Sequence, residues 1–196
     1  MIAIGLYSDI GSGKSFVAEL FRNFGAFVIN ADREVAKLLS TEDIKQEIQQ
    51  HFPDAVKGSK IDKGYLARKV FADKTKLIEL EDIIHPPVKK IIWQKYREAA
   101  NDSTEILVLD IPLLYDSEFE DICDVKIFID TTDDVRFERL YKNRGLCKDE
   151  VLKREKFQPA HDLKKQKADF VITNSDDKLH TEEQVKQILT IIRKNS

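Results

Sequence analysis

A short segment near the amino terminus has the residue types and spacing that phosphate binding requires. It consists of Gly11, Ser12, Gly13, Lys14, Ser15 and Phe16. Its glycines allow successive backbone N–H groups to surround phosphate oxygens, and a helix that begins here adds partial positive charge. Lys14 can reach the β and γ phosphates of a nucleotide, and the Ser15 hydroxyl can bind Mg²⁺. The segment therefore predicts the end of a Walker A loop, with an ordinary glycine-rich turn as the alternative.

Two residues before this segment depart from the full Walker A pattern. Ser8 stands where such a loop has glycine, and Asp9 follows it. A carboxylate here can repel a polyphosphate unless its side chain faces solvent or hydrogen-bonds the backbone of the turn. The loop is still predicted to bind phosphate, and a reduced affinity is the alternative that these residues leave open.

The segments around the loop predict the elements that position it. An apolar run at 1–6 predicts a strand before the loop, and helically spaced apolar residues at 16–24 predict a helix after it. Further buried strands are expected at 26–29, 105–109, 125–129 and 169–173. This alternation favours one α/β core, a parallel sheet flanked by helices, with mostly helical interruptions at about 31–103 and 140–167.

Helical periodicity and capping residues predict the helices of these interruptions and of the carboxyl-terminal part. They are expected at 63–71, 75–84, 88–100, from Thr131 or Thr132 to about 142, and from Thr181 onward. A possible cap at Thr41 opens another helix, which ends before Pro53. His85 precedes two prolines, a pattern that usually ends a helix. The stretch at 75–100 is therefore predicted to be divided near His85.

The composition excludes several classes of protein. The chain has 196 residues, a formal net charge of −3 and 42% hydrophobic residues, which is typical of a soluble globular protein. A nearly neutral chain offers no strong field for a polyanion, so no nucleic-acid partner is expected. The apolar run at 106–114 is too short to span a membrane. With no export signal, and with Cys123 and Cys147 expected as free thiols, the predicted location is the cytoplasm.

Charged residues follow two of the predicted strands. Asp32 and Arg33 come just after the strand at 26–29, and Asp110 follows the run at 106–109. In open α/β sheets, ligands bind at the carboxyl ends of the strands. Asp110 stands where a Walker B acid would help to hold Mg²⁺, although an Asp at a strand end is as often a turn or cap residue.

Basic residues are concentrated between positions 139 and 167. This stretch carries ten lysines and arginines against four acidic residues. A solvated helical face is the usual explanation of such a run and accounts for most of the lysines. Arginine differs, because its planar guanidinium can hold phosphate through two parallel hydrogen bonds. Arg139 and Arg144 are therefore candidate phosphate ligands.

The order of these and other segments resembles the dephospho-coenzyme A kinase family. The matching segments are the loop, 28–32, 61–71, 80–86, 111–116, 139–144, Gln158 and 168–174. They follow one another across nearly the whole chain, so the set is more specific than any one segment. The family usually has glycine at positions 8 and 9, an acid at Asn30, Glu at Asp116 and Asp at Gly145.

This resemblance implies a P-loop kinase that uses ATP with Mg²⁺. The reaction would transfer the γ-phosphoryl group to the ribose 3′-hydroxyl of dephospho-coenzyme A, giving coenzyme A and ADP in the final step of coenzyme A biosynthesis. It also implies one unit with a core at about 1–30, 104–139 and 168–196. A helical acceptor-binding region at about 31–103 and a helical lid at about 140–167 would complete it. The sequence makes no prediction of the oligomeric state.

The resemblance further implies roles for individual residues. Asp32 matches the family's base, Arg144 matches its lid arginine, and Arg139 is second to it in closing over ATP. With Lys14, the first two form the expected catalytic set. The expected acceptor-binding residues are Asp32, Arg33, His85, Pro112 and Leu113. Local packing of His85 and core packing of Leu113 stay open as alternatives.

Three alternative functions fit part of these observations. One is another small-molecule or nucleotide kinase of the same fold, which the loop alone does not distinguish. A second is a relative that keeps the fold but binds ATP weakly because of Ser8 and Asp9. A third is a GTP-driven switch, which is disfavoured because the nearest guanine-reading candidate, 174–176, lacks the required lysine and spacing.

Overall fold

The computed structural model of the chain describes residues 1–58, 60–112, 114, 117–156 and 158–194. The chain divides into two compact units, Met1–Ile29 with Ala99–Ser196, and Asn30–Glu98. Leu113, one of the expected acceptor-binding residues, lies outside the described residues. Within the described part of the chain, no helix is both long enough and apolar enough to cross a lipid bilayer.

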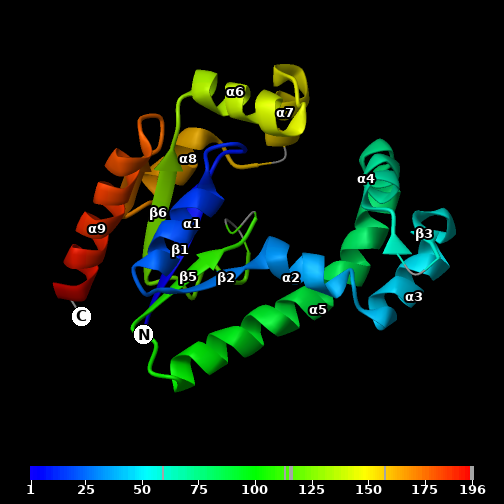
Figure 1. Ribbon diagram of the computed structural model, residues 1–196, viewed down its shortest axis with the longest axis horizontal. Helices are drawn as coiled ribbons and strands as arrows, with labels where there is room; N and C mark the ends of the chain where they lie inside the picture. The colour runs from blue at the N-terminus through cyan, green and yellow to red at the C-terminus, as the bar shows by residue number, and fades with distance from the viewer. Residues whose placement is uncertain (59, 113, 115–116, 157, 195–196) are drawn as a thin grey trace. The chain divides into compact units, whose positions relative to one another are not determined.

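The first unit is built on a five-stranded sheet (Figure 1). Its strands are β1 (Ile2–Ser8), β2 (Phe27–Asn30), β5 (Ile106–Asp110), β6 (Val125–Asp130) and β7 (Phe170–Thr173). Their order is β2-β5-β1-β6-β7, and the pairs β1–β5, β1–β6 and β6–β7 are parallel. The predicted parallel sheet is confirmed. Because β5 and β6 both border β1, the loop after β1 lies between the ends of two neighbouring strands.

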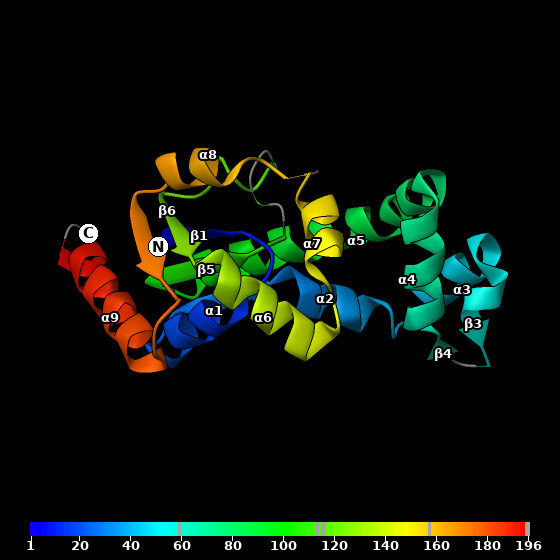
Figure 2. The same ribbon diagram turned by 90° about the horizontal axis from the view of Figure 1, so that it is seen from above.

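Helices cover both faces of this sheet. The helices of this unit include α1 (Lys14–Asn23), α6 (Asp133–Arg144), α7 (Lys148–Glu155), α8 (His161–Gln166) and α9 (Lys178–Lys194). Figure 2 shows α1 and α9 on one face and α8 on the other. On the first face, Ile4 and Leu6 of β1 pack with Phe21 of α1 and Leu189 of α9 in the buried core. Alternate residues of β1 therefore fix α1, and with it the end of the loop, against the sheet.

The last helix begins three residues before the expected position. It starts at Lys178, where Asp177 Oδ1 accepts a hydrogen bond from the His180 N–H at 2.8 Å. Thr181, which was predicted to open the helix, is fully buried within it. Its hydroxyl donates to Oδ1 of Asn174 at 3.1 Å. The prediction was wrong because a threonine with acidic residues after it resembles a cap, whereas here an Asp satisfies the end of the helix.

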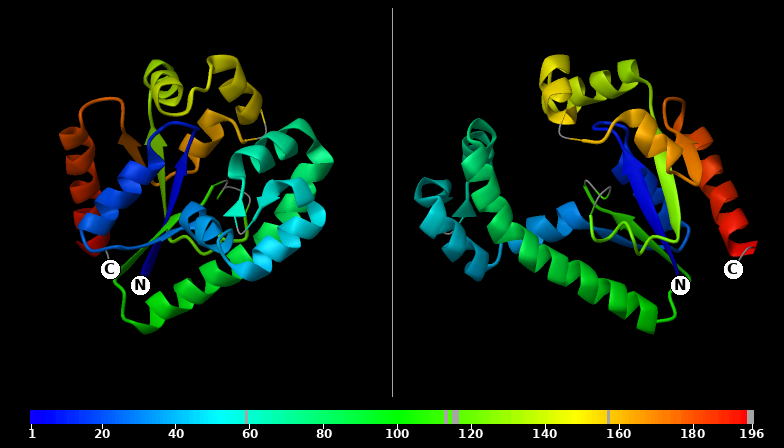
Figure 3. Two further views of the ribbon diagram at one scale, coloured as in Figure 1. Left: turned by 45° about the vertical axis from the view of Figure 1, so that its right-hand side comes forward. Right: turned by 180° about the vertical axis from the view of Figure 1, so that it is seen from behind.

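The second unit is mostly helical. It contains α2 (Ala31–Leu38), α3 (Glu42–His51), a 3₁₀ turn (Pro53–Ala55), β3 (Val56–Lys57), β4 (Lys60–Ile61), α4 (Lys63–Ala72) and most of α5 (Lys74–Asn101). Strands β3 and β4 form an antiparallel hairpin that the sequence did not predict, because two-residue strands leave no alternation to recognise. Figure 3 shows α3 and α4 near the start of the long α5 helix.

Helix α5 continues through the two prolines that were predicted to divide it. Pro86 and Pro87 lie inside the helix, and His85 is an exposed residue of its interior. Each proline lacks an N–H and removes one helical hydrogen bond, at a cost of about 3 kcal/mol. The buried residues Ile84 and Val88 lie on either side of the prolines. Their packing holds the two halves in one helix, so tertiary contacts outweigh the local preference.

Candidate active site

The phosphate loop joins β1 to α1 with two glycines in the left-handed region. Gly11 has φ +86° and Gly13 has φ +85°. A Cβ atom on Gly11 would lie 2.8 Å from Leu140 of α6, and one on Gly13 would lie 2.3 Å from Nδ2 of Asn174. Both positions therefore require glycine. Gly13 is the N-cap of α1 and makes no side-chain cap hydrogen bond, which leaves the first N–H groups of the helix for an anion.

Side chains from several elements hold the carbonyl groups of this loop. The bonds are Lys164 Nζ to Ser8 O at 3.3 Å, Arg136 Nη1 to Ile10 O at 2.9 Å, Asn174 Nδ2 to Ser12 O at 2.7 Å and Thr131 Oγ1 to Ser12 O at 3.0 Å. All four donor residues are buried. The carbonyls of alternate residues are thus fixed, which leaves other N–H groups of the loop to bind an anion.

Two arrangements of Asp9 were expected, a side chain that faces solvent or one that hydrogen-bonds the backbone of the turn, and the structure shows a third. Its side chain is 8% exposed, and its Oδ1 lies 2.5 Å from Nζ of Lys164 in α8. Its Oδ2 lies 2.5 Å from Nδ1 of His161, which is also in α8. Burial by itself raises the pKa of Asp9, but hydrogen bonds from Lys164 and then His161 outweigh it and hold the pKa below the usual range. The carboxylate is therefore charged and compensated by α8.

The loop lysine and the expected Walker B acid lie in contact. Nζ of Lys14 is 3.1 Å from Oδ1 of Asp110 and donates to the carbonyl of Ile111 at 2.8 Å. Asp110 ends β5, the neighbour of β1, and is 3% exposed. The sheet order brings these two residues together from positions far apart in the sequence. Ser15, in the first turn of α1, is exposed.

The donor set around Lys14 suits a hard cation. A hydroxyl and a carboxylate are oxygen ligands of the type that Mg²⁺ prefers, and Mg²⁺ commonly uses one or two carboxylates together with substrate phosphates. The buried hydroxyl of Ser12 has no hydrogen-bond partner among the described residues. This unpaired polar atom, within a loop rich in N–H donors, also indicates a place for a polar ligand.

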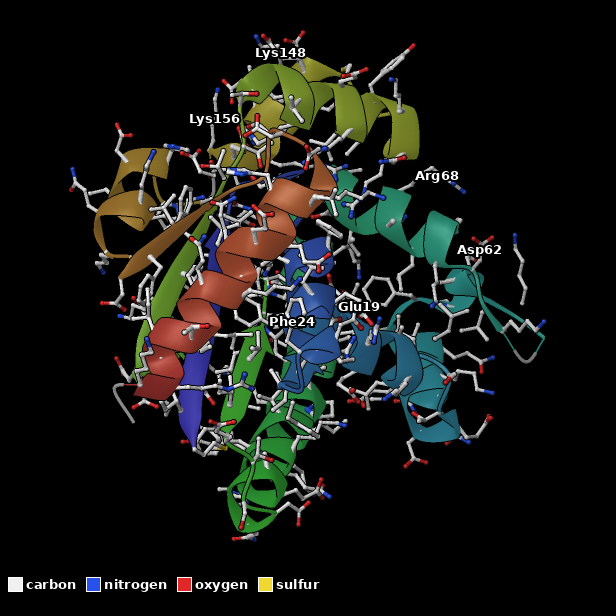
Figure 4. The ribbon with its side chains drawn as sticks, turned by 60° about the vertical axis from the view of Figure 1, so that its left-hand side comes forward. Glu19, Phe24, Asp62, Arg68, Lys148 and Lys156 are labelled. Carbon is white, nitrogen blue, oxygen red and sulfur yellow. The ribbon has the colours of Figure 1, made fainter. Side chains whose placement is uncertain are left out.

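Two arginines of α6 have different surroundings. Nη1 of Arg139 would lie 3.5 Å from a Cβ on Gly13, so this guanidinium stands beside the end of the phosphate loop. Arg144 is the last residue of α6 and is exposed. Lys148 at the start of α7 and Lys156 just after its end are also exposed (Figure 4), as expected of a solvated basic face.

A third arginine of α6 was missed from the sequence. Arg136 is 5% exposed and lies 2.6 Å from Oδ1 of Asp133 and 2.5 Å from Oε1 of Glu155 in α7. It also holds the loop carbonyl of Ile10. The basic residue content of α6 was visible in the sequence, but nothing there separates a buried arginine from an exposed one.

The other expected site residues have varied positions. Pro112 is exposed just after β5, and Phe16 is partly buried against the core in α1. In the second unit, Asp32 and Arg33 are exposed in the first turn of α2. Asn30 caps this helix, because its Oδ1 accepts a hydrogen bond from the Arg33 N–H at 2.8 Å. The cap fixes the turn that carries Asp32.

Helix α2 is joined to α5 by a buried acid. Glu34 is 7% exposed, and its Oε1 lies 3.1 Å from Nζ of Lys37 and 3.6 Å from Nζ of Lys95. Lys95 belongs to α5, so this contact links the helix of Asp32 to the helix of His85. Thr41, the expected cap, is the N-cap residue of α3 but its hydroxyl donates to the carbonyl of Leu38 instead.

A parallel sheet whose central strand leads through a glycine loop into a helix, with a lysine and an acid in contact at the strand ends, is the arrangement of the P-loop class of proteins, to which the P-loop kinases belong. The fold agrees with solved structures of this class. A shikimate kinase from Acinetobacter baumannii aligns with a TM-score of 0.51 at 16% identity, covering 100% of this chain and 95% of that one. A closer structure, from Thermus thermophilus, aligns with a TM-score of 0.80 at 32% identity, covering 97% and 96%.

The sequence pattern of the family described as Dephospho-CoA kinase matches residues 2–180. The Dephospho-CoA kinase of Bacillus licheniformis is 38% identical over 192 residues, which covers 96% of this chain and 95% of the relative. That of Thermus thermophilus is 32% identical over 188 residues, covering 96% and 90%. The chain belongs to the dephospho-CoA kinase family, and it is an enzyme, a kinase. The resemblance noted in the sequence is confirmed.

Proposed function

We propose that this protein phosphorylates the ribose 3′-hydroxyl of dephospho-coenzyme A with ATP, giving coenzyme A and ADP. The observation that carries the proposal is the contact of Lys14 with Asp110 beside a phosphate loop whose carbonyls are held by buried donors. Family membership supplies the acceptor, and this contact supplies the donor half of the reaction. No nucleic-acid or membrane partner is needed for this chemistry, and the cytoplasm is our predicted location.

On the donor side, this chain's residues bind and orient ATP. The loop N–H groups that are not bonded within the turn surround the β-phosphate, and Lys14 exchanges its contact with Asp110 for phosphate oxygens. Arg139, beside Gly13, stabilises negative charge that develops during transfer, and Arg144 joins it as the lid arginine. Each of these groups is a cation or an N–H donor, as an electron-rich transition state requires.

The oxygen ligands of the site fit Mg²⁺. Ser15 and Asp110 would hold the ion, together with oxygens of the nucleotide. When bound, Mg²⁺ neutralises charge on the β and γ phosphates. The buried position of Asp110 keeps its carboxylate in place for this role.

On the acceptor side, Asp32 acts as the base. It accepts the proton of the 3′-hydroxyl while the hydroxyl oxygen forms a bond to the γ-phosphorus, and the bond to the β–γ bridging oxygen breaks to release ADP. Arg33, His85, Pro112 and Leu113 complete the proposed acceptor-binding set. The region at about 31–103 binds the acceptor, and the lid at about 140–167 excludes water that would otherwise take the phosphoryl group.

The proposal is tested by ADP release coupled to a spectrophotometric assay, with Mg-ATP and dephospho-coenzyme A. AMP, CMP, pantetheine and a reaction without acceptor are run in parallel, and the product is identified by mass. We expect turnover only with dephospho-coenzyme A, with coenzyme A as product. Turnover with another acceptor would show a different kinase of this fold. A folded protein that turns over none of these acceptors would support the alternative that the chain keeps the fold but binds ATP weakly.

A further inference from the structure

An acidic residue inside a phosphate loop needs a physical explanation, and the structure provides one. The Asp9 cluster consists of Asp9, His161 and Lys164. Lys164 is 5% exposed although it is a lysine, and its ammonium contacts both the carboxylate of Asp9 and the carbonyl of Ser8. Burying a lysine is costly unless it is paired, so this contact is specific. His161 also packs edge-on against Phe128 of β6, with ring centroids 5.1 Å apart.

Without such partners, the carboxylate of Asp9 would compete with phosphate. An Asp side chain readily accepts a hydrogen bond from the backbone N–H two residues further along, which here is the N–H of Gly11. That N–H belongs to the group of donors on which phosphate binding depends. The N–H of Ser12 already donates to the main-chain oxygen of Asp9 at 3.2 Å, which brings the turn close to the carboxylate. A released Asp9 would therefore act as an internal anion at the phosphate site.

We propose that Lys164, assisted by His161, is a positioning residue for nucleotide binding, which holds Asp9 against α8 and away from the N–H groups of its own loop. The role does not require contact between Lys164 and ATP. It rests on the proposed function only in taking ATP as the ligand of the loop. It also explains how the loop works with Asp9 at a position where the family usually has glycine.

The test is a mutant cycle read by equilibrium binding of a non-hydrolysable ATP analogue with Mg²⁺, using isothermal titration calorimetry on the full chain. The variants are Lys164→Met, Asp9→Ala and the double variant. Lys165→Met is the matched control, because Lys165 is the next residue of α8, is exposed and pairs with Asp130 at 2.6 Å. Circular dichroism and thermal unfolding establish that each variant is folded.

We expect Lys164→Met to raise the Kd of the analogue about tenfold, because an unpaired carboxylate remains beside the loop. Asp9→Ala should stay within about twofold of the parent, because it lacks the competing carboxylate. The double variant should recover most of the affinity lost in Lys164→Met for the same reason, but not all of it, because it also lacks the bond from Lys164 to the Ser8 carbonyl. In steady-state assays, Lys164→Met should raise the KM for ATP while kcat and the KM for dephospho-coenzyme A stay close to parental values. A lysine that merely stabilises the fold would lower the free energy of unfolding without changing the Kd of the analogue or the KM for ATP in the folded variant.

Two results would overturn the proposal: a double variant that binds as weakly as Lys164→Met, or a Lys164→Met that binds as tightly as Lys165→Met. If Lys164→Met does not fold, His161→Ala takes its place, with an expected rise of about threefold in Kd that Asp9→Ala again cancels. A parent that binds the analogue but does not phosphorylate dephospho-coenzyme A would contradict only the proposed acceptor. A parent that binds no analogue would contradict both proposals, and an active parent with a cycle that shows no rescue would contradict only this one.

Discussion

The two units of the chain prepare their proposed ligands in different ways. In the first unit, the groups around the phosphate loop are buried and already hydrogen-bonded, as with Arg136 at Ile10 and Asn174 at Ser12. In the second unit, Asp32 and His85 are exposed on helices that are themselves fixed by other residues. From this difference we propose that the donor site is organised before ATP arrives, whereas the acceptor-side groups acquire their partners from the substrate.

The largest expected effect concerns the second unit, whose proposed site residues are exposed. Asp32→Asn keeps the shape of the side chain but removes the base, so kcat should fall about a thousandfold. The KM for ATP should stay close to that of the parent, because the phosphate loop is unchanged. Asp82→Asn, an exposed acid on α5 of the same unit, is the control. Steady-state kinetics with nearly parental turnover in Asp32→Asn would remove the base assignment.

The next largest effect concerns the phosphate loop of the first unit, whose groups are already held by hydrogen bonds. Lys14→Ala removes a cation from the transferred phosphoryl group, so kcat should fall about three hundredfold. The variant should also bind the ATP analogue more weakly and unfold at lower urea concentration, because Asp110 loses its contact with Lys14. Calorimetry and urea unfolding measure the two changes. Unchanged analogue binding would contradict the assignment of Lys14 to the nucleotide.

Two arginines of α6 allow a residue proposed to act on ATP to be compared with a buried structural residue in the same helix. Arg139→Met should lower kcat about thirtyfold, which is about 2 kcal/mol of transition-state stabilisation, without changing the free energy of unfolding. Arg136→Met should instead lower the free energy of unfolding by about 2 kcal/mol, because Arg136 is buried and its carboxylate and carbonyl partners lose their donor. Urea unfolding and steady-state assays of both variants separate the roles. Equal effects on stability would mean that the two arginines do not differ as described.

The smallest effect concerns the pH dependence of stability. The pKa of Asp9 is lowered in the folded protein, where Lys164 and His161 face its carboxylate and Asp130 lies near His161. A lowered pKa contributes stability above the unfolded pKa of about 3.9, and this contribution is lost as the pH falls through the folded pKa.

Asp9→Ala should therefore be less stable than the parent at pH 7 by about 1 kcal/mol, and the difference should shrink below about pH 4. Urea unfolding at several pH values measures it. Asp162→Ala, an exposed acid of α8, is the control. A difference that stays constant down to pH 2 would argue against the ion pair.

Local patterns were sufficient to predict the phosphate loop and the sheet. The loop is defined by neighbouring residues whose spacing alone identifies them, and the buried strands are short apolar runs. The position of Asp110 at a strand end near the loop was expected from the rule that parallel strands present their carboxyl ends at one edge, whereas its contact with Lys14 was seen only in the structure. What these predictions share is that each depends on residues close in sequence or on a general rule of topology.

The remaining features depend on pairings that the sequence does not specify. The buried carboxylate of Asp9 needs a cation beside it, but its partner Lys164 lies 155 residues away and is one of many basic residues in its stretch. Asn174 and Thr181 form a buried chain of hydrogen bonds to Ser12, although threonine before acids more often caps a helix. The continuity of α5 through Pro86 depends on packing rather than on local preference. Tertiary context decides all three.

The hydrogen bonds that fix the phosphate loop also set when it can work during synthesis. The loop precedes in the sequence all the residues that hold its carbonyls, which are Arg136, Lys164 and Asn174, and Asn174 in turn accepts from Thr181. A nascent chain therefore has the residues of the loop long before it has the donors that shape it. We therefore expect the loop to gain its nucleotide-binding shape only after the residues up to Thr181 have been synthesised.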